Sequence, residues 1–151
     1  MKAFVLDASL TMEWFGGTPS AGALTKRSLF DDRVAVMPHL WRLEVMNVLT
    51  TWRRRGDITG AQGSHIMHNV MQLPSAVIDE GSPEAEVDLA TRHEISAYDA
   101  SYLRAAILTS QPLASLDRQL LRAAKSEGIE CLQSPGIAGR SGGVDGRPPH
   151  V

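Results

Sequence analysis

Short apolar runs alternate along the chain with longer segments whose apolar residues recur every three or four positions. The short continuous runs are typical of strands buried on both faces, and they predict strands at residues 3–6, 34–37, 76–78, 113–116 and 129–132. The longer segments, with serine, proline or glycine near their ends, predict helices at residues 7–15, 19–30, 38–55, 59–73, 82–93, 96–109 and 117–126. This alternation predicts an α/β fold in which helices cover both faces of a central parallel sheet.

The pattern stops near the C-terminus. Residues 134–151 are rich in glycine, proline and arginine and keep no apolar period. A segment of this composition buries too little apolar surface to offset the entropy of ordering. We therefore expect one folded domain at residues 1–133 and a disordered tail at residues 134–151.

Bulk composition narrows the class of protein. The 151 residues are 43% hydrophobic, which suits a globular domain. With 15 basic and 17 acidic residues the net charge is −2, so we do not expect the chain to coat nucleic acid through bulk positive charge. Asp7 interrupts the first apolar run, which argues against a signal peptide, and no apolar stretch reaches the length of a membrane span. We expect a cytoplasmic protein.

Four acidic residues lie at positions where the apolar pattern predicts no charged side chain: Asp7, Glu44, Asp99 and Asp117. Asp7 and Asp117 directly follow strand-like runs, whereas Glu44 and Asp99 lie on otherwise apolar faces of predicted helices. Ligands of parallel α/β sheets bind beyond the carboxyl ends of the strands, which is where Asp7 and Asp117 are placed. If these two strands are neighbours, the two carboxylates lie about 5 Å apart.

Helix capping is the simpler interpretation for three of these acids. Asp7 and Asp117 each precede a predicted helix and can cap it. Ser96 and Asp99 have the three-residue spacing of a capping box. Capping and ligand binding stay open for each of the three when it is considered alone.

Glu44 has no such explanation. It lies within a predicted helix, on a stripe with Leu40, Leu43 and Asn47 that we expect to face inward. A half-buried carboxylate requires a partner. Arg42 is close in sequence but faces elsewhere, because residues two apart on a helix do not face each other.

Taken together, the four acids predict a cation site. Carboxylates held close together raise each other's pKa or bind a cation. Oxygen ligands without a suitable cysteine or histidine favour Mg²⁺ or Mn²⁺ over Zn²⁺. Such a site can activate water and orient it on a phosphodiester. We therefore predict that all four acids bind metal and catalyse phosphodiester hydrolysis.

Four segments, in this order, match the motifs of one protein family: residues 4–9 (FVLDAS), 38–47 (PHLWRLEVMN), 96–102 (SAYDASY) and 112–117 (PLASLD). Through them the chain, over residues 1–133, resembles the PIN-domain ribonucleases. The resemblance is strongest to the VapC-type toxins of bacterial VapBC type II toxin–antitoxin systems. Each motif alone is degenerate, but four in order with this spacing are fairly specific.

The resemblance implies a three-layer α/β/α fold and a Mg²⁺- or Mn²⁺-dependent endoribonuclease. Asp7, Glu44, Asp99 and Asp117 would bind metal directly or through water, Glu44 would help to orient the attacking water, and Ser115 would contact the site. The resemblance also implies a homodimer, a cognate VapB-type antitoxin that blocks the active cleft, and transfer RNA, other structured RNA or messenger RNA as substrate. The C-terminal tail has no counterpart in it.

Other functions compete with this one. A non-catalytic PIN-like binding module usually lacks one or more of the acids, whereas all four are present. A phosphatase of the haloacid dehalogenase kind would carry a second aspartate two residues after Asp7, where Ser9 stands. A receiver domain would show an acid pair near the first strand and a lysine near the last, and neither is evident. Another nuclease of the PIN superfamily stays open, although the small size of the chain favours the toxin.

Arg53, Arg54 and Arg55 end the predicted helix at residues 38–55. Their charges suit the negative end of a helix and a solvated face. The alternative is a patch that binds phosphate groups.

Overall fold

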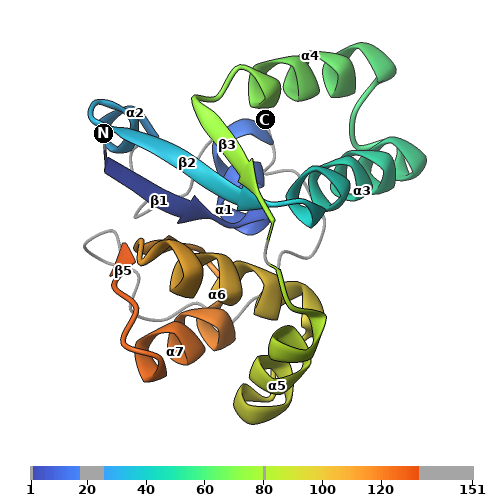
Figure 1. Cartoon of the computed structure of the whole chain (residues 1–151). Helices are drawn as coiled ribbons and strands as arrows, with labels where there is room; N and C mark the ends of the chain where they lie inside the picture. Colours follow the sequence, from blue (N-terminus) through green and yellow to red (C-terminus); the bar gives the residue numbers. More distant parts are fainter. Residues whose placement is uncertain (1, 18–25, 80, 133–151) are drawn as a thin grey trace.

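The computed structural model describes residues 2–17, 26–79 and 81–132, and over these ranges the chain forms a five-stranded parallel sheet with helices around it (Figure 1). The strands are β1 (Lys2–Leu6), β2 (Arg33–Pro38), β3 (Ser75–Ile78), β4 (Leu113–Ala114) and β5 (Cys131–Leu132). The helices are α1 (Ala8–Phe15), α2 (Lys26–Phe30), α3 (Leu40–Arg55), α4 (Gly60–Met71), α5 (Pro83–His93), α6 (Ala97–Thr109) and α7 (Arg118–Ser126). The strand order is β3-β2-β1-β4-β5.

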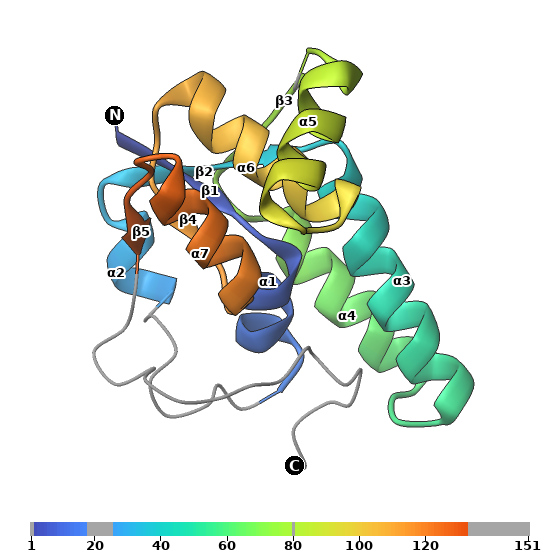
Figure 2. The same ribbon diagram turned by 90° about the horizontal axis from the view of Figure 1, so that it is seen from below.

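Helices cover both faces of the sheet. Helix α6 packs on β1, β2 and β4, and α5 and α7 lie beside it on the same side (Figures 1 and 2). Helices α1, α3 and α4 contact one another, and α1 and α4 lie on the other side of the sheet (Figures 1 and 2). The predicted three-layer α/β/α fold with a central parallel sheet is therefore confirmed. No helix within the described ranges combines the length and the hydrophobicity needed to traverse a lipid bilayer.

The central strand is buried on both faces, as its continuous apolar sequence predicts. Phe4, Val5 and Leu6 of β1 are completely buried. Trp41 and Trp52 of α3 are also buried and extend the core away from the sheet. Trp41 lies in the first turn of α3 and donates from Nε1 to Thr11 Oγ1 of α1 at 2.9 Å, which positions the start of α3 relative to the helix that follows β1.

Most predicted elements are confirmed, with shifted ends. Strand β2 includes Pro38, so α3 begins at Leu40 rather than at residue 38. Strand β4 stops at Ala114 because the chain turns there, and the backbone N–H of Asp117 donates to Ser115 Oγ at 2.9 Å. Of the helix predicted at residues 19–30, the structure describes Lys26–Phe30. Residues 18–25 and the predicted tail lie outside the described residues.

The end of α1 packs closely on α3 at Gly16, which makes this position sensitive to added volume. A Cβ atom on Gly16 would lie 2.4 Å from Cη2 of Trp52 and 2.6 Å from the carbonyl oxygen of Met12. We expect Gly16→Ala to lower the free energy of unfolding by about 1–3 kcal/mol, because an overpacked core must shift. Urea denaturation measures this change.

Gly60→Ala is the matched control. Its Cβ would meet the flexible Arg53 side chain, 3.2 Å away, and alanine favours the helix more than glycine does. We expect this variant to be as stable as the wild type or slightly more so. A Gly16→Ala variant as stable as Gly60→Ala would contradict the close packing of α1 on α3.

Candidate active site

The four predicted acids line one pocket beyond the carboxyl ends of the central strands. Asp7 follows β1 and Asp117 follows β4 by a short turn, and these two strands are neighbours. Strands β2 and β3 lie on one side of β1 and strands β4 and β5 on the other, so the strand order reverses between β1 and β4, where parallel sheets leave a crevice. The pocket has a volume of about 180 Å³ and is lined by Asp7, Ala8, Ser9, Met12, Glu44, Val48, Asp99 and Asp117.

Asp7 is held by two serine hydroxyls rather than by the helix that it precedes. It is 5% exposed, and its Oδ2 accepts hydrogen bonds from Ser115 Oγ at 2.5 Å and Ser9 Oγ at 2.6 Å. Asp7 occupies the N-cap position of α1, as predicted, but its side chain makes no capping hydrogen bond to the helix. Burial raises the pKa of Asp7, and the charge of Asp117 raises it further, although both serine bonds lower it. Ser115 contacts the site, as the resemblance implies.

Asp117 and Asp99 lie at the starts of the helices that border the pocket. Asp117 caps α7 as predicted, because its Oδ1 accepts from the backbone N–H of Leu120 at 3.0 Å. Ser96 caps α6 by accepting from the N–H of Asp99 at 3.0 Å. Burial raises the pKa of Asp99 to about 6, with further contributions from the charges of Asp117 and Asp7. Asp117 therefore both caps its helix and lines the pocket, whereas at α6 the cap is made by Ser96, which is only one half of the capping box predicted for Ser96 and Asp99.

Tyr102 is the partner of Glu44 that the sequence did not reveal. Its hydroxyl donates a hydrogen bond to Glu44 Oε2 from the adjacent helix α6. Burial, followed by the charges of Asp7 and Asp99, raises the pKa of Glu44 to about 7, although the Tyr102 bond lowers it. Burial also raises the pKa of Tyr102, so its hydroxyl stays protonated and remains a donor.

The stripe that carries Glu44 faces inward less than we predicted. Leu43 is 63% exposed, and Asn47 is also exposed. Helix α3 instead turns Val45 and Leu49 toward the core. Glu44 therefore lies at the edge of the buried face, where its carboxylate reaches both Tyr102 and the pocket.

The chemistry of the donor set fits a hard divalent cation. No lysine, arginine or histidine is among the residues that line the pocket, and the pKa of three of its acids is raised. Within residues 2–17, 26–79 and 81–132, no three histidine, cysteine, aspartate or glutamate side chains already stand where they could hold one metal ion. Direct binding of one cation by three of them would therefore require side-chain movement, whereas the resemblance also allows binding through water. Their roles as ligands and catalysts stay predictions.

The raised pKa values predict how the stability of the metal-free protein depends on pH. The pKa of Glu44 is raised from 4.5 to about 7 and that of Asp99 from 3.8 to about 6. For each group, at a pH between its unperturbed pKa and its raised pKa, the unfolded chain binds fewer protons than the folded protein does. The free energy of unfolding therefore falls as the pH rises through this interval. We expect these two carboxyl groups to lower the melting temperature measured in EDTA as the pH is raised from about 4 to about 7.

Glu44→Gln is the control for this prediction, because its amide does not titrate. Its melting curve against pH should be flatter, and near pH 8 in EDTA the variant should be more stable than the wild type (an order-of-magnitude expectation of about 1 kcal/mol). Mg²⁺ should raise the wild-type melting temperature more at high pH, because metal ligands must be deprotonated. Parallel curves for the two proteins would contradict this account of Glu44.

The arginine triplet lies far along α3 from the pocket. Glu44 and Arg55 are separated by 11 residues, or about 16 Å of helix. The Arg53 side chain lies close to α4, since its Cδ would be 3.2 Å from a Cβ on Gly63. All three arginines are exposed in the last turn of α3, which fits the interpretation as a helix end and a solvated face, and the phosphate-binding alternative stays a prediction.

Comparison with known proteins identifies the family. The family model described as the PIN domain matches residues 4–126, and the chain belongs to the PIN-domain family. The family predicted from the four sequence motifs is therefore confirmed. No curated protein sequence matches the chain.

Solved structures share the fold at low sequence identity. PAE2754 from Pyrobaculum aerophilum has a TM-score of 0.68 and 23% identity, over 82% of this chain and 86% of that one. VapBC2 from Rickettsia felis, bound to a DNA fragment from its promoter, has a TM-score of 0.64 and 12% identity, over 86% and 97% of the two chains. Mycobacterium tuberculosis VapC20, described as a sarcin-ricin loop cleaving toxin, has a TM-score of 0.60 and 14% identity, over 86% and 98%.

Proposed function

We propose that the protein is a metal-dependent endoribonuclease and the toxin of a toxin–antitoxin pair. The observation that carries this proposal is the pocket that four carboxylates line, without a basic side chain, at the switch point of a PIN-domain sheet. A pocket of this charge repels an RNA phosphate unless a cation compensates it. The description of VapC20 as a sarcin-ricin loop cleaving toxin supports the same class of activity.

Asp7, Glu44, Asp99 and Asp117 would hold Mg²⁺ or Mn²⁺. When bound, the cation supplies charge stabilisation at the phosphate and lowers the pKa of an attacking water. The Tyr102 hydroxyl fixes Glu44 through Oε2, which leaves the carboxylate able to orient that water.

Two side-chain hydrogen bonds hold the buried Asp7 carboxylate in place. Ser9 and Ser115 both donate to its Oδ2, and Ser115 Oγ also accepts from the backbone N–H of Asp117. These bonds join the ends of β1 and β4. Groups that orient ligands in this way are often needed for metal affinity as much as the ligands themselves.

We further propose a homodimer and a VapB-type antitoxin as protein partners. Leu43 and Tyr98 directly precede Glu44 and Asp99 in sequence and are 63% and 65% exposed. Large exposed apolar side chains suit a protein partner that covers the neighbouring acids. The substrate would be transfer RNA, another structured RNA or messenger RNA.

Sequencing of RNA ends after induction in a bacterial host tests the proposed function. A metal-dependent toxin should stop growth and create new ends at a small number of RNA sites, and purified protein should make the same cuts with Mg²⁺ or Mn²⁺ but not with EDTA. A non-catalytic binding module would create no new ends. Cleavage of DNA flaps in place of RNA would favour another nuclease of the superfamily.

A further inference from the structure

The outward face of α7 carries a row of basic side chains that begins beside the carboxylate pocket. Arg118, Arg122 and Lys125 are four and three residues apart, so they share one face of the helix, and all three are exposed. We refer to these three residues as the α7 basic row. Arg118 directly follows Asp117, which lines the pocket, and the row extends from there along about 10 Å of helix.

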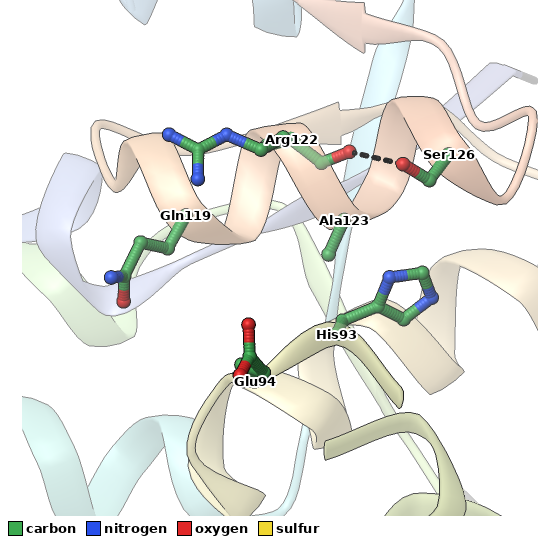
Figure 3. Close-up of a pocket in the computed structure, with 6 residues that line it drawn as sticks. All are labelled: His93, Glu94, Gln119, Arg122, Ala123 and Ser126. Atoms are coloured by element: carbon green, nitrogen blue, oxygen red, sulfur yellow. Dashed lines mark hydrogen bonds between the residues drawn. The ribbon is translucent and has the colours of Figure 1, made fainter. Parts of the chain in front are cut away.

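The charges of the row are not neutralised by neighbouring acids. No ion pair among residues 2–17, 26–79 and 81–132 includes a member of the row. The Arg122 side chain runs along α7 toward the start of the helix rather than across to Glu94 (Figure 3). Glu127, directly after α7, instead contacts His93 at 2.6 Å and Arg92 at 3.1 Å. The three positive charges are therefore available to a ligand.

The stability of α7 does not account for the row. Like charges four residues apart on a helix destabilise it, as Arg118 and Arg122 do here. Arg118 also lies in the first turn, where the helix dipole disfavours a positive charge, and only Lys125 lies in the last turn, where the dipole favours one. Helix α7 contains no acidic residue that would offset the repulsion. An anionic partner would relieve this local cost.

The surroundings of the row favour a phosphate backbone over an acidic protein as this partner. The core of a protein interface is apolar and rich in aromatic side chains. Among the described residues, the exposed large apolar side chains lie at or before Leu108, and α7 carries none of them. Arginine also matches phosphate oxygens with paired donors. Because no basic side chain lines the neighbouring carboxylate pocket, a nucleic acid held there needs positive charge at the border of the pocket.

We propose that the α7 basic row binds the phosphate backbone of the RNA beside the cleaved bond, an inference that rests on the proposed ribonuclease function. The cleaved phosphodiester would lie at the carboxylate pocket, and neighbouring phosphates would lie against Arg118, Arg122 and Lys125. Phosphate contacts fix the position of a nucleic acid but carry no sequence information directly. The row would therefore increase the affinity for RNA of any sequence.

RNA binding in EDTA, where no metal-dependent cleavage occurs, tests the proposal. A labelled RNA of random sequence is titrated with the full chain at several salt concentrations, for the wild type and for a variant that combines Arg118→Gln, Arg122→Gln and Lys125→Gln. The variant should bind about tenfold more weakly at low salt, and its log affinity should fall less steeply with log salt, by about 2 in slope, because three phosphate contacts are lost. Its melting temperature should not fall, because glutamine suits a helix and the repulsion is removed. An unchanged affinity and slope, or no binding by the wild type, would overturn the proposal.

A variant that combines Arg53→Gln, Arg54→Gln and Arg55→Gln is the matched control, because it removes the same charge from the end of α3. It should bind RNA nearly as the wild type does, and an equal loss in both variants would overturn a specific role of α7. A polyglutamate peptide that displaces the labelled RNA as well as unlabelled RNA does would also overturn the proposal, in favour of an acidic protein partner.

The binding measurement separates this proposal from the nuclease function. Binding that depends on the row would support the proposal even if the wild type cleaved no RNA. RNA cleavage by the wild type, together with unchanged binding by the α7 variant, would overturn the role of the row and leave the nuclease function standing.

Discussion

Replacing Asp99 with asparagine is expected to abolish RNA cleavage without unfolding the protein. The amide keeps the shape of the side chain but removes one of the four charges that would hold the cation. The cap of α6 survives, because it uses the backbone N–H of Asp99 and Ser96 Oγ. We expect the cleavage rate to fall by about 10³-fold or more, since groups that act as a unit lose most of their effect when one is removed.

Asp88→Asn is the control for this variant, because Asp88 is an exposed acid on α5 outside the pocket. Cleavage of a labelled RNA and the melting temperature are measured for both variants. Asp88→Asn should cleave at the wild-type rate. An Asp99→Asn variant that folds and still cleaves at that rate would remove Asp99 from the site.

Replacing Tyr102 with phenylalanine is expected to reduce cleavage about 10- to 100-fold, as for other groups that orient metal ligands. The ring keeps its place in the core, but Glu44 loses the hydrogen bond that lowers its pKa. The pKa of Glu44 should therefore rise, and the pH at which the rate is half-maximal should rise with it. This shift in the pH profile distinguishes a role at Glu44 from a loss of packing.

Tyr98→Phe is the matched control, since it removes a hydroxyl from an exposed tyrosine one helical turn earlier on α6. Its rate and pH profile should match those of the wild type. A Tyr102→Phe variant that behaves like Tyr98→Phe would show that the hydroxyl does not act on Glu44.

The sequence predicted which four acids line the pocket because each one interrupts an apolar pattern. The positions of Asp7 and Asp117 after strand-like runs were enough to place them at one edge of a parallel sheet. The sheet order then explains why they meet, since β1 and β4 are neighbours although more than 100 residues separate Asp7 from Ser115. Local sequence patterns predict the helices and strands, but only the pairing of strands distant in sequence brings the acidic side chains together.

The hydrogen-bond partners of the acids could not be predicted in the same way. Tyr102 reaches Glu44 from 58 residues away, through the packing of α6 near α3, and nothing local to either residue indicates that contact. Asp7 occupies the predicted N-cap position of α1, but its side chain does not cap the helix, because Ser9 and Ser115 supply competing donors. One sequence signal did indicate that Tyr102 lies near the pocket: it follows Asp99 by three residues, a spacing that places both side chains on one face of α6.

The central claim is that Asp7, Glu44, Asp99 and Asp117 form one cation site. Anomalous diffraction from crystals soaked in Mn²⁺ tests it most directly. We predict an anomalous peak inside the pocket that these four carboxylates line, and its loss in crystals of Asp99→Asn. A pocket without a peak at saturating Mn²⁺, or a peak bound elsewhere on the protein, would contradict the claim.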